Sequence, residues 1–232
     1  MYIKLNLNIS AARQLPDDNP LKRHEARSEI KPFLLVGIGG MVDSLVPDHL
    51  VTDKMIDRFL RISPPMCRLN AEFDPIIQEI EQAYVLGHVF SSVASSVVAI
   101  ERMLNDARMK LHDHCNTPKR KELWGKGPIN DWKPNIDSLL KWGYIKSDLA
   151  QELRDVFGIR CRYLHSGPIG TLDGDSIRSV TTAFDTLTEF IGFPARLFEI
   201  TDRVKCLDTS HPLYEVFYKP AMTMQFERPE DR

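Results

Sequence analysis

The chain has 232 residues, of which 43% are hydrophobic and 27% are charged, a composition typical of a soluble globular protein. Its formal net charge of -2 excludes strong nonspecific binding of nucleic acid over the whole surface, but not a local basic groove. The cysteines are widely spaced and form no CxxC pair, which favours reduced thiols in a cytoplasmic protein. No apolar run is long enough to cross a bilayer, and the N-terminus lacks a signal-peptide core, so we expect no membrane association.

The N-terminal third contains one predicted strand, one predicted helix and a long polar segment. Residues 2–9 alternate between apolar and polar side chains, which is the period of a half-buried strand. Residues 11–32 are polar and interrupted by prolines, and we predict a solvated loop around a short charged helix. Thr52 precedes apolar residues at helical spacing, so it is predicted to cap a short helix that ends at Ser63-Pro64-Pro65.

A long helical pattern begins at Asp74-Pro75, where a carboxylate can cap the first turn and proline suits the first helical position. Apolar residues, Phe90 and Ala94 among them, then recur every three or four positions up to Asn116, and Gly87 could bend the helix. Four further helices are predicted: a short one ending at Gly143, one starting at Ser147 or Asp148 and ending at Ser166-Gly167-Pro168, one capped by Asp175 or Ser176 and ending at Gly192, and a short one over residues 195–203.

These elements predict a mainly α protein, an up-and-down helical bundle with small β elements contributed by the N- and C-terminal segments. Residues 222–226 alternate like a strand and could pair with residues 2–9. We expect an N-terminal extension over residues 1–73 that packs on the bundle, a helical domain over residues 74–204 and a C-terminal tail over residues 205–232.

Two residues of the helix that starts near Ser147 conflict with its apolar face. Arg160 and His165 occupy positions that the helical period assigns to the buried side, and a buried arginine is costly unless it is paired. A structural Arg160 would bind helix-end carbonyls or a carboxylate, for which Glu101 is the candidate, and a structural His165 would cap the helix. Alternatively the pair faces a phosphate, because arginine offers a planar charged fork and histidine titrates near neutral pH.

The run Arg160-Cys161-Arg162-Tyr163-Leu164-His165 ends one amphipathic helix and is followed by another. This arrangement resembles the HEPN superfamily, small helical bundles whose signature is an arginine and a histidine separated by four residues. The likeness covers roughly residues 74–192. It implies that Arg160 and His165 are catalytic. Arg162 lies three residues before His165, so it could share the face of His165 and contact substrate, although a solvated surface arginine is the alternative. The residue after the signature arginine is usually polar in the family, and Cys161 departs from that pattern.

The resemblance implies a metal-independent endoribonuclease that acts as a homodimer, with both motifs facing one cleft. The 2'-hydroxyl of RNA would attack the neighbouring phosphate and leave a 2',3'-cyclic phosphate, with no cofactor. Such an enzyme could serve in stress, as the toxin of a toxin–antitoxin pair or in phage defence, with an antitoxin as protein partner. Cys161 favours the alternative, a module without catalysis that binds RNA, a nucleotide or a protein. If Arg160 and His165 line a solvent-open cleft across a dimer, the enzyme is favoured. If Arg160 is sealed against Glu101 or carbonyls, the enzyme hypothesis fails.

Two further patterns are candidates for binding. The predicted loop over residues 117–134 combines Lys119, Arg120 and Lys121 with Trp124, and charge beside a stacking ring suits RNA, although a solvated loop anchored by its tryptophan is the alternative. The run His112-Asp113-His114-Cys115 contains metal-ligand residue types. Neighbouring positions on a helix point in different directions, so we interpret it as a solvated helix end and expect no metal site.

Overall fold

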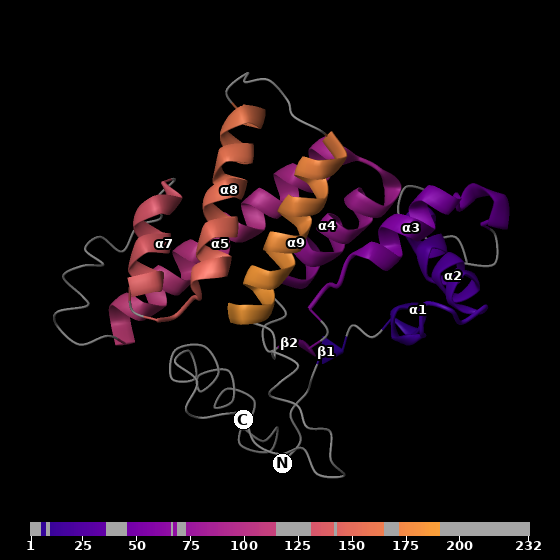
Figure 1. Cartoon of the computed structure of the whole chain (residues 1–232), viewed down its shortest axis with the longest axis horizontal. Coiled ribbons are helices and arrows are strands. Elements are labelled where there is room, and N and C mark those ends of the chain that lie inside the picture. The colour runs from indigo at the N-terminus through magenta and orange to yellow at the C-terminus, as the bar shows by residue number, and fades with distance from the viewer. Residues whose placement is uncertain are drawn as a thin grey trace, which may run out of the picture.

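The computed structural model is helical, with one short two-stranded ladder (Figure 1). It describes residues 6–7, 10–35, 46–65, 67–68, 73–114, 131–141, 143–164 and 172–190. Most of these residues lie in helices, which confirms the predicted mainly α class. Within these ranges, no helix combines the length and the apolar character that crossing a membrane requires.

The N-terminal region contains more helix than its sequence pattern indicated. The charged helix predicted within residues 11–32 is present at Lys22–Leu35, but it includes Pro32. Ala12, Ala26 and Ile30 are fully buried, so the segment packs on the core and is not the solvated loop that we predicted around that helix. The few residues that face the core are too sparse to stand out from the surrounding charges. The helical elements are α1 (Ala11–Gln14), α2 (Lys22–Leu35), the 3-10 turn η2 (Asp48–Leu50) and α3 (Asp53–Arg61).

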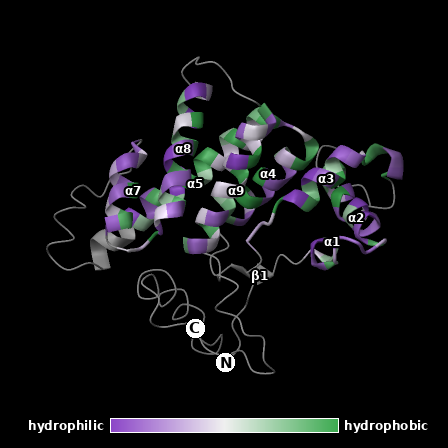
Figure 2. Cartoon of the chain, viewed as in Figure 1, coloured by the Kyte–Doolittle hydropathy of each residue, from purple (hydrophilic) through white to green (hydrophobic). Residues whose placement is uncertain are grey.

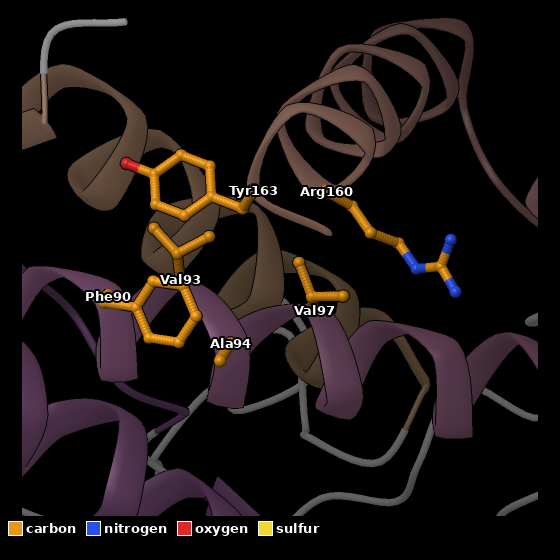
Figure 3. Close-up of a pocket in the computed structure, with 6 residues that line it drawn as sticks. All are labelled: Phe90, Val93, Ala94, Val97, Arg160 and Tyr163. Atoms are coloured by element: carbon orange, nitrogen blue, oxygen red, sulfur yellow. The ribbon is translucent and has the colours of Figure 1, made fainter. Parts of the chain in front are cut away.

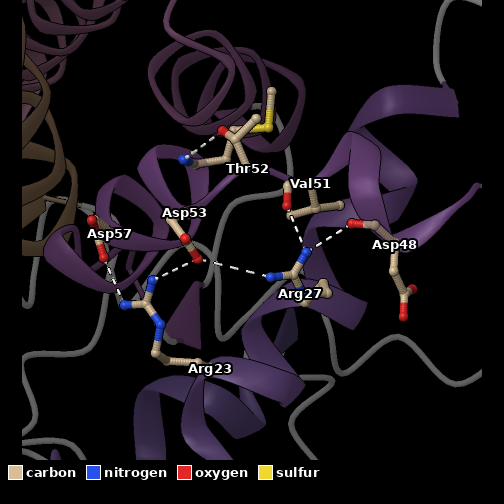
Figure 4. Close-up of polar contacts among 8 residues, drawn as sticks. Arg23, Arg27, Asp48, Val51, Thr52, Asp53 and Asp57 are labelled. Carbon is tan, nitrogen blue, oxygen red and sulfur yellow. Dashed lines mark hydrogen bonds and ion pairs between the residues drawn. The ribbon is translucent and has the colours of Figure 1, made fainter.

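The start of α3 follows the prediction, because the Thr52 hydroxyl accepts a hydrogen bond from the Met55 amide at 3.3 Å. Two arginines of α2 hold this region together (Figure 4). Arg23 pairs with carboxylates of α3, and Arg27 donates to the carbonyls of Asp48 and Val51, each at 2.7 Å. The arginines therefore fix α2 against both the chain that leads into α3 and α3 itself.

The long helical pattern that begins at residue 74 is two helices, α4 (Asp74–Leu86) and α5 (Val89–His114). Gly87 separates them with a left-handed φ of 82°, and the His88 amide closes the turn on the Ala83 carbonyl at 2.8 Å. The residue that caps α4 is Phe73, so Asp74 lies in the first turn and is not the cap. The left-handed conformation of Gly87 ends α4, so the structure has two helices here and not the single bent helix that we predicted.

Three helices complete the described part of the bundle. Gly143 has a φ of 75° at the predicted stop, and Asp175 lies inside the first turn of the last helix, which begins earlier than predicted. The helices are α7 (Trp132–Lys141), α8 (Ser147–Leu164) and α9 (Leu172–Phe190). The predicted helix over residues 195–203 and the tail over residues 205–232 lie outside the described residues.

The ladder joins β1 (Asn6–Leu7) and β2 (Cys67–Arg68), which are antiparallel. The described part of the predicted N-terminal strand therefore pairs with a segment that we had not predicted to be a strand. The partner that the sequence suggested, residues 222–226, lies outside the described residues.

α5 lies at the centre of the bundle, where α4, α7, α8 and α9 pack against it (Figure 1). Apolar residues gather where α4, α5 and α9 meet (Figure 2). Small polar residues line the contact between α5 and α9, where the hydroxyls of Ser92 and Ser176 lie 2.6 Å apart. These short side chains let α5 and α9 approach each other closely.

Candidate functional site

Arg160 lies in the last turns of α8 and reaches toward α5. Its Nη2 atom lies 3.2 Å from Oε2 of Glu101, so the ion pair that the sequence suggested is formed. The side chain of Arg160 is 15% exposed and that of Glu101 is 25% exposed. The pair is thus shielded from bulk water on most sides without being sealed from it.

Glu101 is held by a second contact from a third helix. Trp132, a fully buried residue of α7, donates its Nε1 hydrogen to Glu101 Oε2 at 3.2 Å. Phe157 of α8 packs on Trp132, with their ring centroids 5.7 Å apart, and the Arg160 guanidinium carbon also lies 5.7 Å from the centroid of the Phe157 ring. One carboxylate therefore connects α5, α7 and α8, and it restricts where the Arg160 guanidinium can lie.

An open groove runs between α5 and α8 beside this ion pair (Figure 3). The rings of Phe90 and Tyr163 meet at one end, with centroids 6.0 Å apart, and Arg160 extends away from them at the other end. Phe90 is 62% exposed. The groove has an almost entirely apolar surface and is lined by Phe90, Val93, Ala94, Val97, Arg160 and Tyr163.

An ion pair joins α8 to the start of α9. Arg162 Nη2 donates to Asp175 Oδ1 at 2.9 Å, so this arginine pairs within the chain, although its side chain is 37% exposed. The Tyr163 hydroxyl is shielded from solvent and has no hydrogen-bond partner among the described residues. Burial, and secondarily the negative charge of Asp175, raise the pKa of Tyr163. The tyrosine therefore stays neutral and acts here through its ring.

Several predicted site residues lie outside the described part of the chain. These are His165, which directly follows the last residue of α8, and the candidate RNA contacts Lys119, Arg120, Lys121 and Trp124. Cys161 is a free, partly exposed thiol. In the described ranges, no group of three or more His, Cys, Asp or Glu residues could hold a metal ion.

The sequence pattern does not predict the groove. The sequence pattern predicted that Phe90 and Ala94 face inward on one long helix, but both are exposed, and Val93 faces the core instead. The break at Gly87 changes which face of the following helix is buried, so the period of α4 cannot be extended into α5. The signal available in the sequence was Gly87 itself, because a glycine that ends a helix also ends the apolar stripe that precedes it.

Comparison with models of known protein families gave no match, and neither did comparison with curated proteins or with solved structures. The function is therefore inferred from the residues of this site.

Proposed function

We propose that this chain is a metal-independent endoribonuclease in which Arg160 contacts the scissile phosphate of RNA. The observation that carries the proposal is the placement of Arg160, a guanidinium held by Glu101 at the end of an open groove. The ion pair involves one nitrogen of the fork, and arginine has further N–H donors that suit phosphate oxygens. The last described residue of α8 is Leu164, so the end of this helix leads directly into His165.

The proposed reaction needs few protein groups, because RNA supplies its own nucleophile. The 2'-hydroxyl attacks the adjacent phosphorus, and the bond to the 5'-oxygen of the next nucleotide breaks. Arg160 would stabilise the negative charge that builds on the phosphate oxygens during this attack. His165 would donate a proton to the leaving 5'-oxygen, and the proton of the attacking 2'-hydroxyl would pass to water.

Glu101 has two opposing effects in this proposal. It positions the guanidinium, and a group held in place before the reaction stabilises the transition state without further reorganisation. It also neutralises much of the positive charge that attracts the phosphate. Substrate therefore competes with Glu101 for Arg160, and we expect modest affinity for RNA.

The same ion pair favours a second candidate, a helical module without catalysis that binds RNA, a nucleotide or a protein partner. In that case Arg160 and Glu101 join α8 to α5 and have no chemical role. Cys161 next to Arg160 supports this alternative, because a thiol is a weaker hydrogen-bonding group than the polar side chain usual at this position of the motif.

The deciding experiment is cleavage of an end-labelled RNA in excess EDTA by the wild type and by Arg160→Ala and His165→Ala. We expect cleavage that leaves 2',3'-cyclic phosphates, and a loss of about 100- to 1,000-fold in each variant, the range for removal of one transition-state donor. The matched control is Arg154→Ala, because Arg154 is another ion-paired arginine of α8, bound to Asp137 at 2.9 Å. This control should cleave like the wild type.

The results separate the two candidates. Absence of EDTA-resistant cleavage by the folded wild type, or cleavage that both variants retain, would overturn the ribonuclease. RNA binding without cleavage would support the module. Circular dichroism of each variant identifies any loss that comes from unfolding.

A further inference from the structure

We infer that the Phe90 and Tyr163 end of the groove is a stacking platform for an unpaired base of RNA, beside the phosphate that Arg160 contacts. This inference rests on the proposed action on RNA and deepens it. It assigns a base subsite to residues to which the motif gives no role.

The first observation is the exposure of a large ring beside a second ring. Phe90 is 62% exposed although it lies next to the buried face of α5, and its centroid is 6.0 Å from that of Tyr163. The planes of the two rings differ by 31°. Tyr163 supports the inner side of Phe90, so the exposed side offers an aromatic face whose position is set by packing.

The second observation is the order of groups along the groove (Figure 3). Phe90 and Tyr163 lie at one end and the apolar residues Ala94 and Val97 lie between. At the other end the aliphatic stem of Arg160 lines the groove, and its guanidinium points outward, beyond the apolar surface. Arg160 is the charged member of the lining set. A nucleotide matches this order, because it joins a flat ring to an anionic phosphate. An apolar protein side chain would fill the aromatic end without using the further N–H donors of Arg160 that its ion pair with Glu101 leaves over.

The platform predicts a preference for single strands. In a duplex the faces of the bases are covered by their neighbours, whereas an unpaired base can turn outward and stack on an aromatic side chain. Stacking needs no particular donor or acceptor pattern, so we expect little dependence on base identity.

The test uses the full-length chain and a fluorescent single-stranded oligonucleotide with 2'-O-methyl groups, which cannot be cleaved by 2'-hydroxyl attack. Binding is measured by anisotropy in EDTA. Phe90→Ala should raise the Kd by about 5- to 100-fold, the effect of removing one stacking contact. Phe90→Trp should bind at least as tightly as the wild type, whereas Phe90→Leu, which keeps the apolar volume without a π face, should resemble Phe90→Ala.

Two controls separate stacking from general effects. Leu50 is an exposed apolar residue of η2, 48% exposed and distant from the groove, so Leu50→Ala should leave the Kd unchanged. For a double-stranded oligonucleotide, Phe90→Ala should change the Kd by less than about twofold, because stacked bases cannot use the platform.

Each outcome decides the inference. Equal binding by Phe90→Ala and wild type, or tight binding by Phe90→Leu, overturns the platform. In that case the EDTA cleavage assay alone decides whether the chain is a ribonuclease. A wild type that neither binds nor cleaves RNA overturns both proposals. If Phe90→Ala instead converts a dimer to a monomer in sedimentation without changing RNA binding, the ring is a contact between copies and the platform is wrong. Binding that depends on Phe90 without cleavage supports the platform and rejects the enzyme.

Discussion

At the scale of single residues, three glycines illustrate how the same residue type serves different needs. Gly87 and Gly143 adopt left-handed φ values of 82° and 75°, which side chains with a Cβ atom rarely adopt. At Gly87 an added Cβ would also lie 2.5 Å from Nη1 of Arg58, whereas at Gly143 nothing lies within 4 Å. Gly158 is different, because it lies inside α8 with open space around it. Neither the backbone conformation of Gly158 nor the space around it requires a glycine.

Alanine substitutions should therefore rank in a fixed order of stability. Gly158→Ala should raise the free energy of unfolding by roughly 0.5–1 kcal/mol, because alanine favours helix over glycine. Gly143→Ala should lower it by about 1–2 kcal/mol through left-handed strain alone. Gly87→Ala should lower it further, because Arg58 must also move away from its ion pair with Asp173. Urea unfolding followed by circular dichroism measures all three, and an equal cost at positions 87 and 143 would show that Arg58 moves freely.

At the scale of elements, the short helix α1 shows how a weak segment is held in place. Its four residues are too few to form a stable helix in isolation. Arg13 anchors it by donating from Nη2 to Glu81 of α4 at 2.7 Å and from Nε to the Phe59 carbonyl at 3.0 Å. The guanidinium also lies 3.8 Å from the centroid of the Phe59 ring. The ion pair is largely buried, with 13% of the Arg13 side chain and 8% of the Glu81 side chain exposed.

Removing one member of this pair should destabilise the fold more than removing both. Glu81→Ala leaves a mostly buried guanidinium unpaired, and we expect a loss of about 3 kcal/mol, near the low end for such pairs because the carbonyl contact remains. Arg13→Met combined with Glu81→Leu should recover much of that loss, since no charge is then buried. The comparison is Arg23→Ala, whose ion pairs are half exposed and should contribute less than about 1 kcal/mol. A double variant as unstable as Glu81→Ala would contradict this account.

The elements also show which features local sequence can predict. Thr52 and Gly143 were correctly placed at a helix start and stop because caps and left-handed glycines are local signals. The contact between Arg160 and Glu101 followed from an arginine on an apolar face that required a carboxylate. The groove did not follow, because the exposure of Phe90 depends on how α5 turns after Gly87 and on where α8 crosses it. Those are properties of packing, and no short segment encodes them.

At the scale of the whole molecule, one apolar core joins the N-terminal helices to the bundle. Ile30 and Phe59 belong to the same buried cluster as Ile80 of α4 and Leu187 of α9. A hydrogen bond also joins the N-terminal helices to the bundle, because Gln82 of α4 donates to the Phe33 carbonyl of α2 at 2.8 Å. The described part of the predicted extension over residues 1–73 therefore covers apolar surface that α4 would otherwise expose to water.

Because the core is shared, the N-terminal helices and the bundle should unfold in one transition. The tryptophans lie between residues 124 and 142, so fluorescence reports on the region around α7, whereas circular dichroism reports on all helices. The two signals should give the same urea midpoint and the same slope. A chain that starts at residue 73 should aggregate or remain unfolded, since Ile77 and Ile80 lose the cover that α3 provides. An early loss of helical signal without a fluorescence change would instead mean that α1 to α3 unfold as a separate unit, and the truncated chain should then fold.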